Sequence, residues 1–203
     1  INRAKFPNTV ANSASGYVSI WEDLRALNVA VSDGNCGALD AVACADIHLE
    51  TGRADALLVG GGEAMSEALF LAFLKLGVLD AGARLGEGSA LMSMETREYA
   101  KERGARVLGE VAGFGTAFSP PASEAILIHA STDAVERAVK QAIHDAGIQP
   151  KDIDVVASGI SGLRTFDDAE LAALVRALGP EVCVAAPKHY LGETLGAGGA
   201  MGM

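Results

Sequence analysis

Short apolar runs alternate with segments of helical periodicity along this chain. The apolar runs have the length of strands, and the segments between them repeat apolar residues at helical spacing. Strands that alternate with helices are typical of α/β folds with a largely parallel sheet, because each helix carries the chain back to the start of the next strand. The expected strands cover residues 28–32, 56–59, 86–96, 106–118, 152–159 and 181–186. The expected helices cover residues 13–24, 35–52, 66–76, 96–105, 133–146, 167–178 and 191–201.

The segment "SPPASE", residues 119–124, divides the chain. Its adjacent prolines, Pro120 and Pro121, break any helix or strand at this point. The alternation of helices and strands begins again after it, with an amphipathic helix expected over 133–146. We therefore expect two regions, at residues 1–118 and 119–203.

Charge and cysteine content argue against several classes of protein. The net charge is −10 and there is no run of lysine or arginine, so neither nucleic acid nor an anionic membrane is an expected partner. The three cysteines show no C-x-x-C spacing, which indicates neither a zinc site nor a disulfide framework and favours the cytoplasm. No apolar run reaches the ~18–20 residues of a membrane span. The glycine-rich turns lack the pattern of a dinucleotide site, and no cofactor or metal is expected.

The stretch "SDGNCGALDAV", residues 32–42, forms a corner between an expected strand and an expected helix. Such a corner can present a nucleophile, and Asn35 and Cys36 compete for the position. Glycine-containing turns also follow the expected strands at 158–162 and 192–199. Ligands of α/β sheets gather at the carboxyl ends of strands, so we expect these three turns to converge.

Several motifs, in the same order, resemble the β-ketoacyl-acyl carrier protein synthases of the thiolase superfamily. They include "DALLVGGGEA", "LGEGSALMSMETREYAKERGARVLGEVAGFGT", "DDAELAAL" and "KHYLGETLGAGGAM". The resemblance implies a layered αβαβα thiolase-like fold with mostly parallel sheets. Residues 1–118 would then belong to its N-terminal half, which holds the nucleophile turn, and 119–203 to its C-terminal half. The family's first and last strands have no counterpart, and the stretch between Glu63 and Gly86 is short, so we expect a fold incomplete at both ends.

The family's chemistry implies a cysteine, two histidines and a supporting lysine. Counting forward from "LRALNVAVS" and back from "VGGGEA" places Asn35 at the cysteine position. Cys36 lies one residue later, about 100° further round a helix. Ser158 stands where the first histidine is expected, Glu193 stands where the second is expected, and Lys188 matches the lysine.

These changes predict a condensation site that has lost its chemistry. An amide such as that of Asn35 is not a nucleophile, a serine does not replace an imidazole near neutral pH, and Glu193 repels a carboxylate or an enolate. The resemblance then implies a chain-length-factor-type subunit without condensing activity. Its expected partners are an active ketosynthase in a heterodimer, or a second copy in a homodimer, and an acyl carrier protein that bears an acyl or malonyl group.

Other interpretations of the same residues remain open. Cys36 would be the nucleophile of a divergent acyltransferase if it were reactive. Asn35 would act as an amide donor in a malonyl decarboxylase, or simply as the N-cap of the helix that follows. His189, beside Lys188, would replace a lost histidine if it faced the same pocket.

Overall fold

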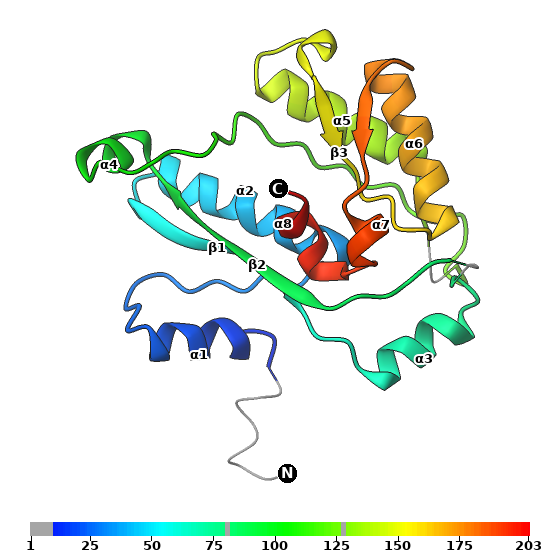
Figure 1. Ribbon diagram of the computed structural model, residues 1–203, viewed down its shortest axis with the longest axis horizontal. Helices are drawn as coiled ribbons and strands as arrows, with labels where there is room; N and C mark the ends of the chain where they lie inside the picture. The colour runs from blue at the N-terminus through cyan, green and yellow to red at the C-terminus, as the bar shows by residue number, and fades with distance from the viewer. Residues whose placement is uncertain (1–9, 80–81, 127–128) are drawn as a thin grey trace.

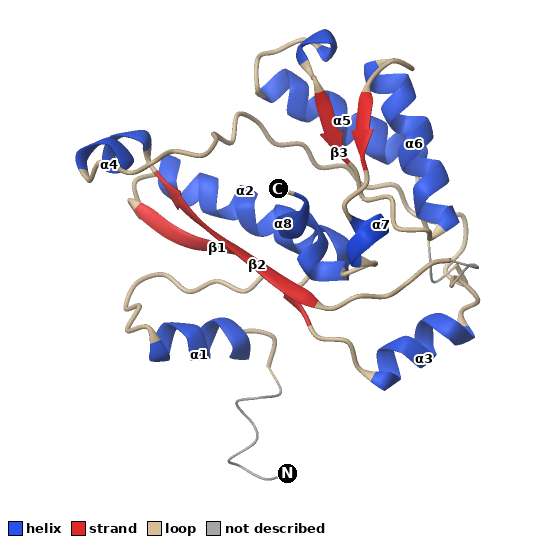
Figure 2. Ribbon diagram, viewed as in Figure 1, coloured by secondary structure: helices blue, strands red, loops and turns tan. Residues whose placement is uncertain are grey.

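The computed structural model describes residues 10–79, 82–126 and 129–203, and it is an α/β structure (Figures 1 and 2). The first part contains α1 (Ser13–Trp21), η2 (Gly34–Cys36), α2 (Gly37–Glu50), β1 (Ala56–Glu63), α3 (Glu67–Lys75), β2 (Gly88–Glu95) and α4 (Arg97–Glu102). The second part contains α5 (Thr132–Asp145), η3 (Pro150–Asp152), β3 (Val155–Ala157), α6 (Arg164–Leu178), β4 (Cys183–Ala185), α7 (Lys188–Leu191), η4 (Leu195–Ala197) and α8 (Gly198–Gly202).

Helix periodicity predicted most of the helices, but the one expected over 191–201 is interrupted, because α7 ends at Leu191 and α8 begins only at Gly198. Capping residues begin two of the helices that were predicted correctly. The hydroxyl of Ser66 accepts a hydrogen bond from the Leu69 amide at the start of α3, and the hydroxyl of Ser131 does the same for Ala134 at the start of α5. Such caps satisfy amides that have no partner inside the helix. None of the helices in the described ranges combines the length and apolarity needed to cross a membrane.

β1 and β2 form an antiparallel pair whose register runs from Ala56 opposite Glu95 to Glu63 opposite Gly88. α2 packs on one face of this pair (Figure 1). The resulting hydrophobic core consists of Val42, Ala45, Leu49, Val59 and Met94.

β3 and β4 form a short parallel pair, with α5 and α6 beside it (Figure 2). α5 and α6 are linked by ion pairs from Arg176 to Asp133 at 2.9 Å and to Glu136 at 3.6 Å. The described sheets are therefore one antiparallel and one parallel pair, where the strand and helix order predicted a largely parallel arrangement.

The turn at η4 and the helix α8 lie against both the start of α2 and the β1–β2 pair (Figure 1). A Cβ atom on Gly61 would lie 2.5 Å from the carbonyl oxygen of Gly196 and 2.8 Å from the Cβ of Ala38. Only glycine permits this approach, because both distances are below van der Waals contact. The glycine run in β1 thus brings the C-terminal segment against the corner at η2.

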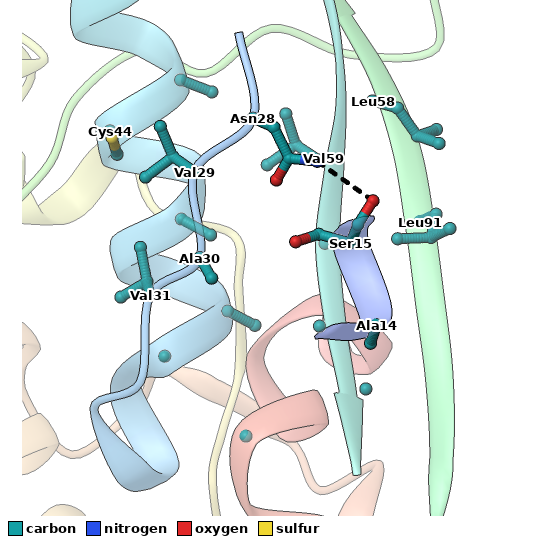
Figure 3. Close-up of a pocket in the computed structure, with 18 of the residues that line it drawn as sticks. Ala14, Ser15, Asn28, Val29, Ala30, Val31, Cys44, Leu58, Val59 and Leu91 are labelled. Atoms are coloured by element: carbon teal, nitrogen blue, oxygen red, sulfur yellow. Dashed lines mark hydrogen bonds between the residues drawn. The ribbon is translucent and has the colours of Figure 1, made fainter. Parts of the chain in front are cut away.

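The prediction of a strand at 28–32 is wrong. These residues are extended, but among the described residues they make no ladder hydrogen bonds. The segment runs beside β1 across a cavity (Figure 3), so its backbone has no neighbour to pair with. An apolar β-branched run indicates a strand only when a partner strand lies next to it.

The prediction of a strand at 106–118 is also wrong, for a different reason. Side chains of α5 take the place of a neighbouring strand. Asp145 accepts from the Phe114 amide at 2.9 Å, and Arg137 donates to the Phe118 carbonyl at 2.7 Å. The segment therefore stays extended along a helix instead of joining a sheet.

β1 was expected to be fully buried, but Val59 is its only buried residue. Leu58 is 52% exposed. α2 covers one face of the strand, and the other face and one edge border the cavity. The apolar run therefore predicted the strand correctly, but the strand is less buried than the run indicated.

Candidate functional site

The corner that precedes α2 is a tight turn with little side-chain bonding. Gly34 has a φ of +50°, and the Cys36 amide donates to the Asp33 carbonyl at 3.1 Å. Asn35 lies inside this turn, half-buried, and Cys36 follows it with an exposed side chain. The N-cap of α2 is Cys36, without a side-chain capping bond, so the prediction of Asn35 as the N-cap is wrong. Asn35 lies in the middle of the η2 turn, and α2 begins only after this turn, at Gly37.

The surroundings of Cys36 oppose thiolate formation. Desolvation of the sulfur by the neighbouring chain raises the pKa of Cys36, and the carboxylates of Asp40 and Asp33 raise it further, while Lys188 lowers it. The pKa of Asp40 is itself raised, first by desolvation and then by its hydrogen bond to Asp33. A reactive cysteine needs the opposite, a positive environment that favours the anion.

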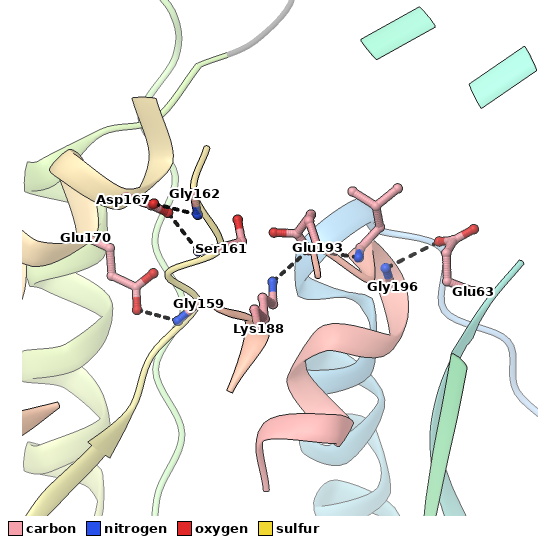
Figure 4. A network of polar contacts seen from close by, with 10 residues as sticks. Glu63, Gly159, Ser161, Gly162, Asp167, Glu170, Lys188, Glu193 and Gly196 are labelled. Atoms are coloured by element: carbon pink, nitrogen blue, oxygen red, sulfur yellow. Dashed lines mark hydrogen bonds and ion pairs between the residues drawn. The ribbon is translucent and has the colours of Figure 1, made fainter. Parts of the chain in front are cut away.

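Lys188 and Glu193 form a buried ion pair in which Lys188 Nζ lies 2.8 Å from Glu193 Oε1 (Figure 4). Lys188 is 8% and Glu193 is 2% exposed. The same carboxylate oxygen accepts the Leu195 amide at 2.8 Å. The Glu193 backbone is bonded to Arg84 and Gly86. Both charges are thus neutralised by each other and fixed in place.

Ser158 is held by β4. Its hydroxyl donates to the Ala185 carbonyl at 3.0 Å, and its amide donates to the same oxygen at 2.8 Å. Ser158 is 5% exposed. The hydroxyl therefore extends the pairing of β3 with β4, and its proton is already engaged.

Two carboxylates on α6 bind the loop after Ser158, and sequence reasoning missed both (Figure 4). Glu170 accepts the Gly159 amide at 2.8 Å, and Asp167 accepts the Ser161 and Gly162 amides at 3.0 and 2.8 Å. Desolvation raises the pKa of Glu170, and the Gly159 amide and Lys188 partly oppose that rise. Their spacing of three residues on one helix was the available signal, because it places both acids on one face.

The three glycine-containing turns lie close together around Lys188. A Cβ on Gly196 would lie 3.7 Å from the Gly34 carbonyl oxygen, and one on Gly198 would lie 2.8 Å from Lys188 Nζ. The charge of Lys188 acts on both Cys36 and Glu170. The structure therefore places Lys188 and its partner Glu193 between the corner at η2 and the loop after β3.

His189 does not join this network. Its side chain is exposed and its ring meets Tyr190 edge to face, with centroids 5.7 Å apart. The proposal that it replaces a missing histidine would need it to face Lys188, and its exposure places it on the outside of α7.

Family comparison accounts for both parts of the chain. The model of the beta-ketoacyl synthase N-terminal domain matches residues 2–113, and that of the C-terminal domain matches residues 108–203. The chain belongs to the beta-ketoacyl synthase family, and its fold is the thiolase-like α/β fold of ketosynthases. The division expected at residues 118 and 119 stays a prediction.

Individual relatives come from fatty-acid and polyketide synthesis. The chain is 30% identical to 3-oxoacyl-[acyl-carrier-protein] synthase 2 of Vibrio cholerae serotype O1, covering 96% of this chain and 52% of the relative. It is 31% identical to the tetracenomycin polyketide synthase ketoacyl synthase beta subunit of Streptomyces glaucescens, covering 92% and 49%.

A solved structure of the ishigamide ketosynthase/chain length factor superposes with a TM-score of 0.84 at 25% identity, covering 95% of this chain and 50% of that chain. The chain spans about half the length of the curated relatives it matches.

Proposed function

We propose that this chain is a non-catalytic ketosynthase homologue that pairs with an active β-ketoacyl synthase and acts like a chain length factor in fatty-acid or polyketide assembly. The buried ion pair of Lys188 with Glu193 is the observation that carries this proposal. It puts a fixed carboxylate where the family resemblance requires a neutral or cationic donor.

The ion pair disfavours the substrate of a condensing enzyme. A malonyl carboxylate close to Glu193 would be repelled by that carboxylate, and Lys188, already paired with it at 2.8 Å, would offset much of this repulsion without adding a net attraction. Lys188 itself is engaged at 2.8 Å and is not free to bind the substrate. An enolate would meet the same repulsion, so decarboxylation gains no stabilisation.

The other two altered positions agree with this interpretation. Asn35 offers an amide where acyl transfer needs a thiol or hydroxyl. The Ser158 hydroxyl donates to Ala185 and is not directed at a substrate. In this interpretation the family's turns and its lysine persist, while the cysteine and both histidines have been replaced.

The partners are proposed from the named relatives. A ketoacyl synthase beta subunit and a ketosynthase/chain length factor are among the proteins similar to this chain, which favours a heterodimer with a ketosynthase over a homodimer. The carrier protein in the name of the Vibrio relative suggests an acyl carrier protein with an acyl or malonyl group as the second partner. The proposed compartment is the cytoplasm.

A condensation assay tests the proposal. The purified chain is incubated with acyl- and malonyl-loaded carrier protein, alone and after co-expression with the intact ketosynthase of its host. We expect no 3-oxoacyl product from the chain alone, a stable heterodimer by light scattering, and a product length that changes when the chain is omitted. Turnover by the chain alone would contradict the proposal.

A divergent acyltransferase that uses Cys36 is the second candidate, and the exposure of this thiol favours it. Its raised pKa weighs against it. Mass spectrometry after incubation with acyl carrier protein distinguishes the two, because only the acyltransferase would leave an acyl group on Cys36.

A further inference from the structure

The carboxylate of Glu193 is held in the way that proteins hold a bound anion. Lys188 Nζ lies 2.8 Å from Glu193 Oε1, and the Leu195 amide donates to the same oxygen at 2.8 Å (Figure 4). A cationic side chain and a backbone N–H that converge on one oxygen make the strong, charge-assisted hydrogen bonds of carboxylate recognition. Both donors belong to the protein, and so does the anion that they bind.

The turn that supplies the amide has a backbone suited to anions. Leu195 has a φ of +43°, in the left-handed region that residues other than glycine rarely adopt. The next residue, Gly196, donates its own amide to Glu63 Oε2 at 3.4 Å. Successive amides around a left-handed residue form a concave anion-binding turn. Both amides of this turn are therefore occupied by carboxylates of the protein itself.

A further donor lies at the same place and is not used by Glu193. Thr194 is 0% exposed, and its hydroxyl has no hydrogen-bond partner in the part of the chain that the structure describes. A Cβ on Gly198 would lie 2.8 Å from Lys188 Nζ and 3.5 Å from this hydroxyl oxygen. The ammonium group and the hydroxyl thus border the same space. A buried hydroxyl without a partner is unfavourable, and an anion held here would accept its proton.

The other acid near Lys188 is not its partner. The charge of Lys188 reaches the carboxyl group of Glu170, but Lys188 pairs with Glu193, and Glu170 Oε1 accepts the Gly159 amide at 2.8 Å. A Cβ on Gly159 would lie 2.8 Å from Glu170 Oε2, so this acid is packed tightly against the loop that it binds. Removal of the Glu193 carboxylate should therefore leave the site without an anion, and the ion pair should not shift to Glu170.

We propose that Lys188, Thr194 and the Leu195 amide form a carboxylate-binding site, and that Glu193 occupies this site as an internal ligand. The external ligand that the site takes is a small monocarboxylate anion, because one cation, one amide and one hydroxyl suit a single carboxylate. In the parent protein the side chain of Glu193 closes the site against free acids. The consequence for a malonyl group rests on the proposed function, but the binding of a free acid does not.

The experiment replaces the internal ligand by an external one. Glu193→Ala removes one methylene group and the carboxylate, and acetate restores a group of the same size and charge in the cavity that remains. Thermal unfolding of the variant is followed in acetate and in acetamide, which has the same shape without the charge, at constant ionic strength. NMR titration with isotope-labelled acetate measures the dissociation constant independently of stability.

We expect acetate to bind Glu193→Ala with a dissociation constant on the order of 10 mM, an affinity well within the limit for so small a ligand. Because acetate then binds the folded state alone, the melting temperature of the variant should rise with acetate concentration. Acetamide should bind at least about tenfold more weakly, because it brings no negative charge to Lys188. The parent protein should not respond to acetate, because Glu193 already fills the site.

Further variants assign the donors of the site. Lys188→Met, added to Glu193→Ala, removes the cation and should weaken acetate binding by about tenfold or more. Thr194→Val, added to Glu193→Ala, removes only the hydroxyl and should weaken acetate binding by about threefold. Glu136→Ala is the matched control, because Glu136 also pairs with a lysine, Lys140, on an exposed face of α5. Acetate should leave the melting temperature of this control unchanged.

Three results would overturn the proposal. The first is that Glu193→Ala binds acetate no more tightly than acetamide, and the second is that adding Lys188→Met leaves acetate binding unchanged. The third applies if Glu193→Ala does not fold in buffer alone, and it is recovery of no more folded protein in acetate than in acetamide. None of these measurements involves condensation, so a parent chain that condenses acyl and malonyl groups would contradict the proposed function and leave the carboxylate site unaffected.

Discussion

The corner at η2 and the segment from α7 to η4 both carry residues that we propose have replaced the catalytic groups of a ketosynthase, but they differ in how those residues are held. Glu193 is buried, paired with Lys188 and bonded to the Leu195 amide. Among the described residues no hydrogen bond to the half-buried Asn35 side chain is recorded, and Cys36 is exposed. Glu193 is therefore held in place by an ion pair and a hydrogen bond, whereas the side chains of Asn35 and Cys36 are not held by such contacts. Reversing them should therefore have very different consequences.

Removing the lysine of the buried pair should have the largest effect. Lys188→Met leaves the Glu193 carboxylate buried without its cation, which typically costs about 3–5 kcal/mol of unfolding free energy. Urea denaturation measures the loss. Lys140→Met is the matched control, because Lys140 pairs with Glu136 on an exposed face of α5 and such a pair contributes about 0.5 kcal/mol. Equal losses in the two variants would mean that the buried pair has no special role.

Neutralising the carboxylate should cost less. Glu193→Gln keeps an oxygen for the Leu195 amide but weakens the bond to Lys188. We expect about 1.5–3 kcal/mol of destabilisation, the range for hydrogen bonds to charged groups. The double variant Lys188→Met/Glu193→Gln should be more stable than Lys188→Met alone, because no charge is then buried unpaired. A double-mutant cycle gives the coupling energy, and simple additivity would contradict the pairing.

The half-buried acid on α6, Glu170, should make stability depend on pH. Desolvation raises the pKa of Glu170 in the folded state, so folding favours its protonated form. That contribution is fully present below the unfolded-state pKa and is lost as pH rises through the folded-state pKa. Glu170→Gln keeps the acceptor for the Gly159 amide and should therefore be more stable than the parent near pH 7, with the difference vanishing near pH 4. Glu181→Gln, at an exposed glutamate, should show no such trend.

The thiol at the corner should respond modestly to its neighbours. Desolvation raises the pKa of Cys36 most, and the charges of Asp40 and Asp33 add to it. Asp40→Asn removes only part of the rise, so the rate of Cys36 alkylation at pH 8 should increase by about two- to threefold. Peptide mapping separates Cys36 from Cys183, which is also exposed and serves as the internal reference. A rate at Cys36 that already exceeds that of Cys183 in the parent would favour the acyltransferase candidate.

Restoring a cysteine at the corner should change least. Asn35→Cys removes no recorded hydrogen bond, and its effect on unfolding free energy should stay within about 0.5 kcal/mol. We expect no condensing activity, because Ser158 and Glu193 would still occupy the two positions where the family resemblance implies histidines. A stable variant that condenses acyl and malonyl groups would contradict the proposed function. It would also show that Ser158 and Glu193 do not prevent condensation.

Helices and motifs were readable from the sequence because their signals are local. Apolar spacing marked α3 and α5, and the short motifs identified the family. Strand predictions failed at 28–32 and 106–118 because a strand is defined by its neighbour. The carboxylates of Asp167 and Glu170 were missed because their partners are backbone amides of the loop before α6, and the spacing of the two acids shows a shared helix face but not what they bind.

The sequence by itself determined the α/β class, the family, and the identity of the groups at Asn35, Ser158, Glu193 and Lys188, since these depend on residue type and order. Tertiary structure decided how those groups are used. It paired Lys188 with Glu193, turned the Ser158 hydroxyl onto β4, and left a groove beside β1. The Ser158 bond and the groove join segments distant in the chain, which only folding brings together, and the pair of Lys188 and Glu193, five residues apart, is buried only by the surrounding fold.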